Sequence, residues 1–519
     1  MQRQSYVRNA AILTATGLLL RAIGMFFRVY IAARIGAEGM GLYQLIYTVY
    51  TLAVTFATAG LSVAATRICA QLFAGGCPGK ARRAMKSVLS LGCGLGFLAG
   101  MLLYAAAPWA AQLWLRDARA LLPLRILAPS LPFMAMSAVW RGYFMAVREV
   151  RPNSIAQLFE QAVRIGVVAC ALHAVDAQDI TRSCAAVVLG NTISEISSWC
   201  LMLAFYRASS KELPGPSKAV DGLWKQLWQI LAPICANQYL TSALRSVENV
   251  MVPACLALFT LSRETALSQY GALKGMAMPV LFFPFSFLGT LSTLLMPEIT
   301  EAYVQGRKQA LRYLVNRVLL LTLALSILAS GLYTVFAYDV AQVLYQSNEI
   351  GFYIAVLGPL TPFMYLESMV DGILKGLNEQ LATFRYSVVD SLLRILLIAL
   401  LLPRFGMKGF LFVMLVSNLL TSLLNWMRLL HVTELKVQWM RWIVKPVCAM
   451  AFSALVWNLL RPLIALPAIG RTLCGGILIT VLYVAALWAI GGIRGEDIWP
   501  AGRKNAKIMQ KTVDINQWI

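Results

Sequence analysis

The chain has 519 residues, of which 59% are hydrophobic and only 13% are charged, and its mean hydropathy is +0.69. This composition excludes an ordinary water-soluble protein, because too few polar residues are present to cover a folded surface. The net charge of +22 does not indicate nucleic-acid binding, since the Lys and Arg residues concentrate in alternate loops, as the positive-inside rule describes for membrane proteins.

Long apolar segments recur along the whole chain, and each is long enough to cross a hydrocarbon core of roughly 30 Å. The sequence therefore predicts an all-α polytopic membrane protein with about 14 transmembrane helices. The expected spans are about 9–33, 41–73, 87–107, 120–146, 154–175, 184–206, 227–258, 268–297, 314–337, 351–377, 385–403, 408–429, 442–461 and 470–492.

A charged, Pro-bearing loop at Arg207–Lys225 divides these spans into two lobes. The predicted organisation is an N-terminal six-helix lobe, a C-terminal six-helix lobe, two extra helices and a tail. These units cover residues 1–210, 223–432, 440–493 and 494–519. The distribution of basic residues places both termini on the cytoplasmic side of the membrane. The first apolar segment carries no cleavage pattern of a signal peptide.

Cysteine and histidine usage argues against a tightly bound metal or another cofactor. The ten cysteines include no C-x-x-C pair and lie mostly inside apolar spans, where small buried side chains are expected. Only two histidines are present, His173 and His431. We therefore predict no cofactor, and we consider coupling to a Na⁺ or H⁺ gradient instead.

The first predicted helix carries two arginines in an otherwise apolar run. Arg21 and Arg28 are seven residues apart and so share one helix face. Arg28 could extend to an interface while Arg21 pairs with a carboxylate elsewhere. Alternatively, two cations on one face of a membrane span could bind an anionic ligand.

Predicted helices seven and eight contain three further ionisable residues. Arg245 and Glu248 could neutralise each other, because residues three apart are neighbours on a helix. Lys274 has no acidic residue at helical spacing in its own segment, so it is the cation least easily explained by local pairing.

The stretch Arg141–Arg164 contains the most informative pattern, and the chain repeats it. Sliding the sequence by 230 residues without a gap aligns the region 111–169 with the region 341–399. In this alignment Pro129-x-x-Pro-Phe-Met matches a second Pro-x-x-Pro-Phe-Met that starts at Pro359. The acid–Arg pairs at helical spacing also match, since Glu160 and Arg164 meet Asp390 and Arg394. Each pair could be structural, offsetting its own insertion cost, or functional.

Two copies separated by an even number of helices have the same orientation in the membrane. This arrangement predicts two lobes related by an axis along the membrane normal, with a central cavity between them. Pro residues inside the predicted fourth, eighth and tenth helices indicate kinks of the kind that transporters place near their sites. The sequence thus favours an alternating-access transporter.

The motif also carries a family resemblance. Arg141-Gly-Tyr-Phe, followed by Pro152, Gln157-x-x-Glu-Gln and Arg164, resembles the stage V sporulation protein B group of polysaccharide-biosynthesis membrane proteins. That group is related to lipid II flippases and to multidrug and toxic compound extrusion exporters. The second copy, with Gly372-x-x-x-Gly and the stretch 402–409, is similar to the corresponding flippase region.

The resemblance implies a flippase for sugars linked to undecaprenyl pyrophosphate, such as precursors of the cell wall or the spore cortex. Arg21 and Lys274 fall where lipid II flippases carry cavity cations, and Arg28 is displaced from such a position by one residue. With Arg245, these residues are the candidate pyrophosphate site. Glu248 is similar to a family acid thought to serve cation coupling, and we expect it to act with Asp390. Expected partners are the lipid substrate, membrane lipids and cell-wall synthesis enzymes, and no nucleic acid.

Two other readings remain open from the sequence. One is a multidrug or cation antiporter of the same fold, although its pocket would favour carboxylates and aromatic residues. The other is a membrane scaffold that recruits cell-wall enzymes without transporting anything. A membrane enzyme is disfavoured, because no loop carries a paired-carboxylate or nucleophile–base motif.

Overall fold

The computed structural model describes residues 2–176, 179–211, 222–463 and 467–494. Within these ranges the chain is helical, with short turns and no strand. Nine helices among the described residues are long and apolar enough to cross a membrane, or ten if one bent pair is counted as a span. The all-α fold class is therefore confirmed, while the number of fourteen spans stays a prediction. The predicted tail, 494–519, lies outside the described residues apart from Arg494.

The first part of the chain folds into seven α-helices. The longest of them bends at Gly36, whose φ of 70° lies in the left-handed region that glycine adopts without strain. This bend separates the first two predicted spans. The helices are α1 (Gln2–Thr58), α2 (Leu61–Ala74), α3 (Pro78–Trp109), α4 (Leu121–Leu127), α5 (Ser130–Ala146), α6 (Arg151–His173) and α7 (Ile180–Lys211).

The second part begins after the 212–221 segment and also contains a long bent helix. Here the bend falls at Gly406, with a φ of 57°. The elements are α8 (Leu223–Thr260), α9 (Arg263–Tyr270), the π-helical turn η3 (Gly271–Ala277), α10 (Met278–Phe282), α11 (Phe285–Val304), α12 (Lys308–Tyr345), α13 (Asn348–Leu357), α14 (Thr361–Gly376) and α15 (Gln380–Thr433).

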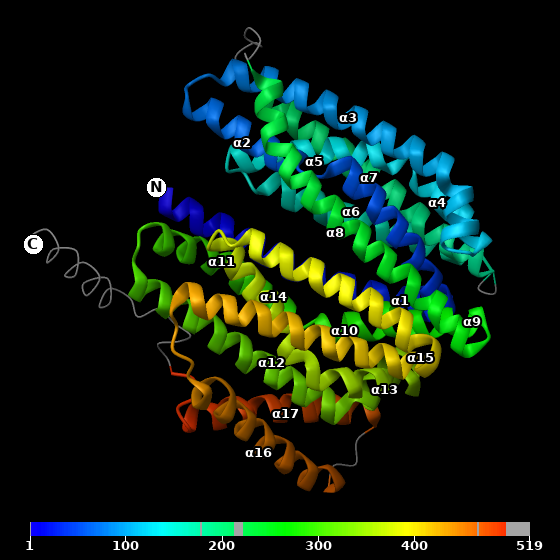
Figure 1. The fold of residues 1–519 in the computed structure, drawn as a ribbon, viewed down its shortest axis with the longest axis vertical. Helices are drawn as coiled ribbons and strands as arrows, with labels where there is room; N and C mark the ends of the chain where they lie inside the picture. Colours follow the sequence, from blue (N-terminus) through cyan, green and yellow to red (C-terminus); the bar gives the residue numbers. More distant parts are fainter. Residues whose placement is uncertain (1, 177–178, 212–221, 464–466, 495–519) are drawn as a thin grey trace, which may run out of the picture.

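Two final helices, α16 (Lys445–Leu460) and α17 (Ala468–Ala489), pack against α12. Trp457 of α16 and Ile479 of α17 are buried in a separate apolar cluster with Phe336 of α12. The hydroxyl of Tyr483 donates to the Ala324 carbonyl at 2.8 Å, which satisfies its polar group inside that cluster. These helices therefore add to the outside of the second part, as Figure 1 shows.

Proline breaks one span in each copy at matching positions. The segment 118–127 and α5 are bent by 44° at the residues around Pro129. A 3₁₀ turn, Gly358–Leu360, separates α13 from α14 at Pro359. Because proline has no backbone N–H to continue the helical ladder, a break at these positions is expected, and the kink predicted in the fourth span is confirmed.

The internal repeat is visible in the backbone. The α5–α6 turn places Arg148 at a φ of 60°, and the matching α14–α15 turn places Asn378 at 63°. Arg116 and Gln346 also correspond, with φ values of 54° and 52°. A residue with positive φ is uncommon outside glycine. Two such matches at the sequence offset confirm that both copies fold alike.

Hydrogen bonds of the two turns correspond as well. The Glu149 amide donates to the Phe144 carbonyl at 3.0 Å, and the Glu379 amide donates to the Leu374 carbonyl at 2.9 Å. The copies thus share the local geometry that sets the angle at which the following helix begins. This places Glu160 and Asp390 at equivalent positions after equivalent turns.

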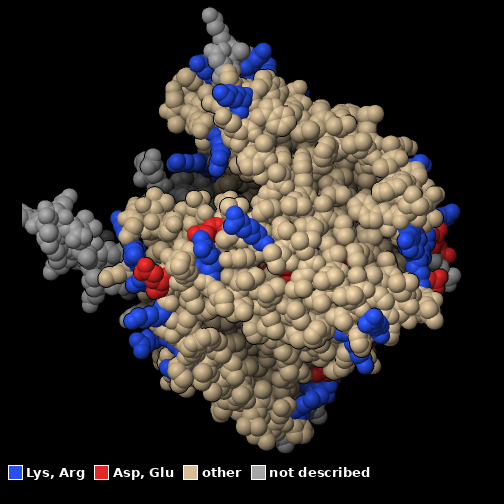
Figure 2. Space-filling view, viewed as in Figure 1, with Lys and Arg blue, Asp and Glu red and all other residues tan. Residues whose placement is uncertain are grey.

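The helices form two groups with a hollow on one side of their seam. In Figure 1 the group with α2–α7 lies above and the group with α10–α17 lies below. Figure 2 shows the surface hollowed between them on the left, where the N-terminus lies, whereas α9 lies at the opposite end in Figure 1. Blue Lys and Arg atoms gather mainly at the ends of the helices, and the broad surface between them is tan. Such an uncharged belt is expected of a protein surrounded by lipid.

Candidate functional site

The first charge cluster consists of Arg141, Glu160, Arg164 and Glu195, from α5, α6 and α7. Arg164 Nη2 lies 2.6 Å from Glu160 Oε1, one helical turn away. Arg141 Nη2 contacts the other oxygen of Glu160 at 3.2 Å. Arg164 Nη2 also lies 3.6 Å from Glu195 Oε1. The predicted intrahelical pair therefore exists, but two further helices contribute to it.

Glu195 is the member of this cluster that the sequence pattern missed. It is only 5% exposed, and its Oε2 atom has no hydrogen-bond partner among the described residues. Its nearest Arg contact, at 3.6 Å, is longer than a hydrogen bond. A glutamate in the middle of an apolar span is itself a sign of function, and that signal was available in the sequence.

The second charge cluster consists of Glu248, Asp390 and Arg394, from α8 and α15. Arg394 Nη1 donates to Glu248 Oε1 at 3.1 Å, while Nη2 donates to Asp390 Oδ2. Ser417, beyond the bend of α15, donates to the other Asp390 oxygen at 2.5 Å. Glu248 and Asp390 are 3% and 4% exposed. The two acids expected to share a cation are thus joined by a guanidinium group.

Two predicted cations, Lys274 and Arg245, lie near this second cluster and differ in their burial and in their contacts. Lys274 is half-buried in η3, with its Nζ 5.8 Å from the centre of the Phe410 ring, and it interacts electrostatically with Glu248. Arg245 is exposed, and no carboxylate of the described residues lies within salt-bridge distance of it. Glu248 pairs with Arg394 instead, so the local Arg245–Glu248 pair considered from the sequence does not form.

The two arginines of α1 are exposed at the seam. Arg21 Nη1 donates to the Ser286 carbonyl of α11 at 3.2 Å, which joins the two parts of the chain. Arg28 lies in electrostatic range of Tyr43 and Tyr345. Within the described part of the chain, neither arginine has a carboxylate partner within 4.0 Å. Their charges are therefore not neutralised locally.

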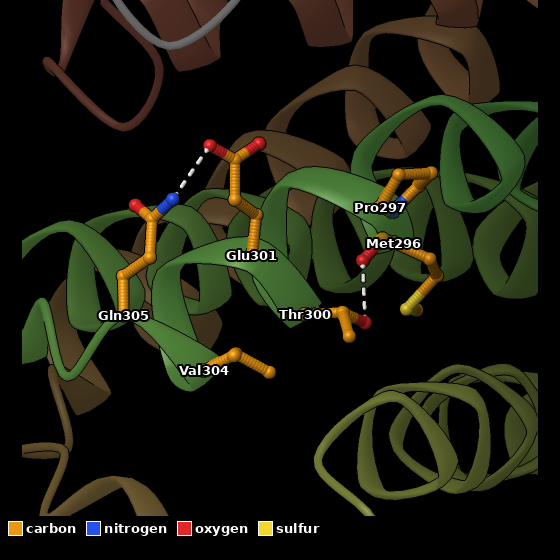
Figure 3. Close-up of a pocket in the computed structure, with 6 residues that line it drawn as sticks. All are labelled: Met296, Pro297, Thr300, Glu301, Val304 and Gln305. Atoms are coloured by element: carbon orange, nitrogen blue, oxygen red, sulfur yellow. Dashed lines mark hydrogen bonds between the residues drawn. The ribbon is translucent and has the colours of Figure 1, made fainter.

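A cavity of about 740 Å³ lies beside the later turns of the same helix α11. Figure 3 shows its lining residues, with Thr300 bonded to the Met296 carbonyl and Gln305 donating to Glu301. Thr300 also donates to the Gly376 carbonyl of α14 at 3.1 Å. The lining is Met296, Pro297, Thr300, Glu301, Val304 and Gln305.

The seam is closed at the end marked by α9. A Cβ atom on Gly271 would stand 2.0 Å from the Ala37 carbonyl oxygen, and one on Gly41 would stand 2.1 Å from the Leu267 oxygen. The α1 backbone therefore touches α9 and η3 directly. Arg263 adds a bond from α9 to the Leu115 carbonyl. The structure is hollow at one end and sealed by backbone contact at the other.

The predicted site residues thus fall into three groups, namely the two arginines of α1, the Glu160–Arg164 pair of the first charge cluster, and the second charge cluster with Lys274 and Arg245 near it. Arg21 and Arg28 line up along α1, while Lys274 accompanies the second charge cluster. Helix geometry puts Lys274 roughly 18 Å along its own segment from the contact of Arg21 with Ser286. Whether all these cations act on one ligand therefore stays a prediction. Among the described residues, no group of three His, Cys, Asp or Glu side chains is arranged to hold a metal ion.

Comparison with known proteins identifies the family. Residues 6–302 match the family described as "Polysaccharide biosynthesis protein", and residues 265–400 match the MatE family. The first match spans more than half of the chain. The chain belongs to the polysaccharide biosynthesis protein family. It is 28% identical over 432 residues to stage V sporulation protein B of Bacillus subtilis (strain 168), covering 82% of this chain and 83% of that protein.

A further relative and two solved structures are also named as flippases or transporters. The lipid II flippase MurJ of the same Bacillus subtilis strain is 27% identical over 167 residues, 31% of each chain. A solved structure of lipid II flippase MurJ in an inward closed conformation gives a TM-score of 0.70 at 14% identity, covering 92% of this chain and 99% of that one. An inward-facing multidrug resistance MATE transporter gives 0.64 at 12% identity, covering 82% and 100%. The fold is thus that of these transporters, and the family membership makes the protein a multi-pass membrane flippase or transporter.

Proposed function

We propose that the protein moves a lipid-linked sugar with a pyrophosphate group across the bacterial plasma membrane by alternating access. The observation that carries the proposal is the pair Arg21 and Arg28, exposed at the seam without carboxylate partners among the described residues. A pyrophosphate in a low-dielectric cavity needs adjacent cations, and the planar fork of Arg suits its oxygens. Arg245 and Lys274 are proposed as further cationic contacts during the transport cycle.

The basic-rich end of the molecule is proposed to face the cytoplasm. Loops at that end carry residues such as Lys80, Arg148 and Lys308, in agreement with the positive-inside rule. The hollow of Figure 2 would then open to the cytoplasm. Contacts at Gly41 and Gly271 would separate when the protein opens to the other side.

Glu248 and Asp390 are proposed to couple transport to a Na⁺ or H⁺ gradient. In this structure Arg394 already satisfies both carboxylates, so a cation would bind only after the guanidinium group moves away. Such exchange could link ion binding to a shift of α8 against α15, because Arg394 ties these two helices together. The predicted recruitment of cell-wall synthesis enzymes remains a further part of the proposal.

Native mass spectrometry of the purified protein tests the substrate. The expected result is a co-purified polyprenyl-pyrophosphate sugar that is lost from the R21A/R28A variant, while both proteins stay monodisperse and insert normally. Arg182→Ala is a matched control, because that side chain is 76% exposed and pairs with Asp179 at the surface. Equal lipid occupancy in wild type and R21A/R28A would refute the proposed site, and a bound organic cation would favour the antiporter.

A further inference from the structure

We propose that the first charge cluster contains a proton-binding site formed by Glu195 and Glu160. It is separate from the coupling acids Glu248 and Asp390, and it does not depend on which substrate is transported. The proton would bridge the two carboxyl groups, so that one serves as hydrogen-bond donor and the other as acceptor.

The geometry of the carboxyl groups carries this inference. Glu195 and Glu160 come from different helices but lie against the same guanidinium group, since Arg164 Nη2 is 2.6 Å from Glu160 Oε1 and 3.6 Å from Glu195 Oε1. Two ionised carboxylates have no hydrogen to share, because each is an acceptor only. One proton converts this repulsive contact into a hydrogen bond, as in other closely spaced carboxyl pairs.

The unused acceptor of Glu195 points to the same conclusion. Its Oε2 atom is buried and has no donor among the described residues, whereas Glu160 receives a guanidinium bond on each oxygen. A buried charged group without hydrogen bonds is costly, and a carboxyl group avoids that cost by taking up a proton. Glu195 is therefore the better position for the proton, with Glu160 as its acceptor.

The cluster's surroundings favour a proton over a metal cation. Helices α1, α4, α5 and α6 pack against α7, which carries Glu195. The titratable groups of α1 that interact with Glu195 are the tyrosines Tyr47 and Tyr50. The charged group of α4 is Arg125, whose guanidinium carbon lies 5.2 Å from the centre of the Tyr104 ring. A Na⁺ ion would be repelled by the two guanidinium groups that flank the pair and would need several oxygen ligands. The groups that interact with Glu195 are Tyr47, Tyr50, Arg141, Glu160 and Arg164.

Proton binding would change the charge of a site next to the seam. Two ionised acids and two arginines give the cluster no net formal charge, and one proton leaves it with a single positive charge. Arg164 and Arg28 both interact with Tyr43, so the added charge lies close to the cationic face of α1. A proton here would then favour an anion in the hollow, and by linkage an anion would favour the proton.

Infrared difference spectroscopy of the full chain in lipid nanodiscs tests the site. Wild type is expected to show a protonated-carboxyl band that shifts in deuterium oxide and responds to pH. Glu195→Gln should remove this band, and Glu160→Gln should remove or displace it. Glu149→Gln is the control, since Glu149 is exposed in the α5–α6 turn of the same copy, and it should leave the band unchanged.

A second variant keeps the result interpretable if Glu195→Gln misfolds. Glu195→Asp keeps an ionisable group but shortens it, so its band should be displaced rather than lost. Melting temperature and monodispersity are recorded for every variant. Identical carboxyl bands in wild type, Glu195→Gln and Glu195→Asp, at every pH at which the protein stays folded, would overturn the proposal.

Discussion

The two charge clusters arise from the same repeated acid–Arg pair, yet their carboxylates are satisfied differently. In the second cluster one guanidinium group serves Glu248 and Asp390, and Ser417 bonds the remaining Asp390 oxygen. In the first cluster two arginines share Glu160, while a buried oxygen of Glu195 receives no donor among the described residues. The difference indicates that the second cluster holds helices together and that the first retains an unsatisfied acid.

Removing the central arginine should have the largest effect, and it should be larger in the second cluster. Arg394→Ala removes the guanidinium group that Glu248 and Asp390 share. Breaking a buried pair in this way costs about 3–5 kcal/mol in soluble proteins and less where a membrane-inserted reference state finds other partners. Arg164→Ala should cost less, because Arg141 still contacts Glu160. Thermal unfolding in detergent measures both.

Arg385→Ala is the control for this comparison, because Arg385 is exposed on the same helix as Arg394 and has no carboxylate within salt-bridge distance among the described residues. Its melting temperature should stay at the wild-type value. Equal losses for Arg164→Ala and Arg394→Ala would mean that Arg141 does not compensate, and the contrast between the clusters would disappear.

Removing both arginines of the first cluster should abolish that compensation. The R141A/R164A variant leaves Glu160 and Glu195 without a cation, so its melting temperature should fall by more than the two single losses combined. Non-additivity is expected because both arginines contact one carboxylate. A double-mutant cycle by thermal unfolding measures the coupling, and simple additivity would show that the two arginines act independently.

Neutralising one acid in each cluster should give unequal results. Glu248→Gln replaces the carboxylate that accepts from Arg394, and loss of a charge-assisted bond costs about 1.5–3 kcal/mol. Glu195→Gln should leave the unfolding free energy nearly unchanged, because a Gln amide can donate to Glu160 in place of the proposed shared proton, and one oxygen of Glu195 has no donor among the described residues. Unfolding of both variants at one pH makes the comparison, and a larger loss in Glu195→Gln would contradict it.

The sequence predicted the fold well because the relevant signals are local. Apolar length predicts membrane helices, and the repeat offset predicts equivalent turns, which Arg148 and Asn378 confirm through their backbone angles. Pro129 and Pro359 likewise predicted the breaks in their spans. In each case the determining interaction lies within a few residues of the signal.

The sites were predicted less completely because their contacts join distant helices. Glu160 with Arg164 and Asp390 with Arg394 were visible as pairs at helical spacing. The bond from Arg394 to Glu248, and the approach of Glu195 to Arg164, depend on how α8 packs on α15 and α7 on α6. Periodicity within one helix contains no information on such packing, so an intrahelical Arg245–Glu248 pair was considered where Arg394 is the partner.

The smallest expected difference concerns the serines of the two clusters. Ser417 is 2% exposed and donates to Asp390 Oδ1, so Ser417→Ala leaves a buried carboxylate oxygen without this donor. The expected loss is about 1 kcal/mol, since bonds to charged groups are worth more than neutral ones but measured values inside membranes are modest. Ser194 instead accepts from Arg164 Nε at a longer 3.3 Å and donates to its own helix. Ser194→Ala should therefore change the unfolding free energy by less than about 0.5 kcal/mol.

Ser417→Thr keeps the hydroxyl group and should restore most of the lost stability, which separates the hydrogen bond from the packing of the side chain. If Ser417→Ala and Ser194→Ala unfold at the same temperature, the Ser417 bond does not contribute to the tighter bonding of the second cluster.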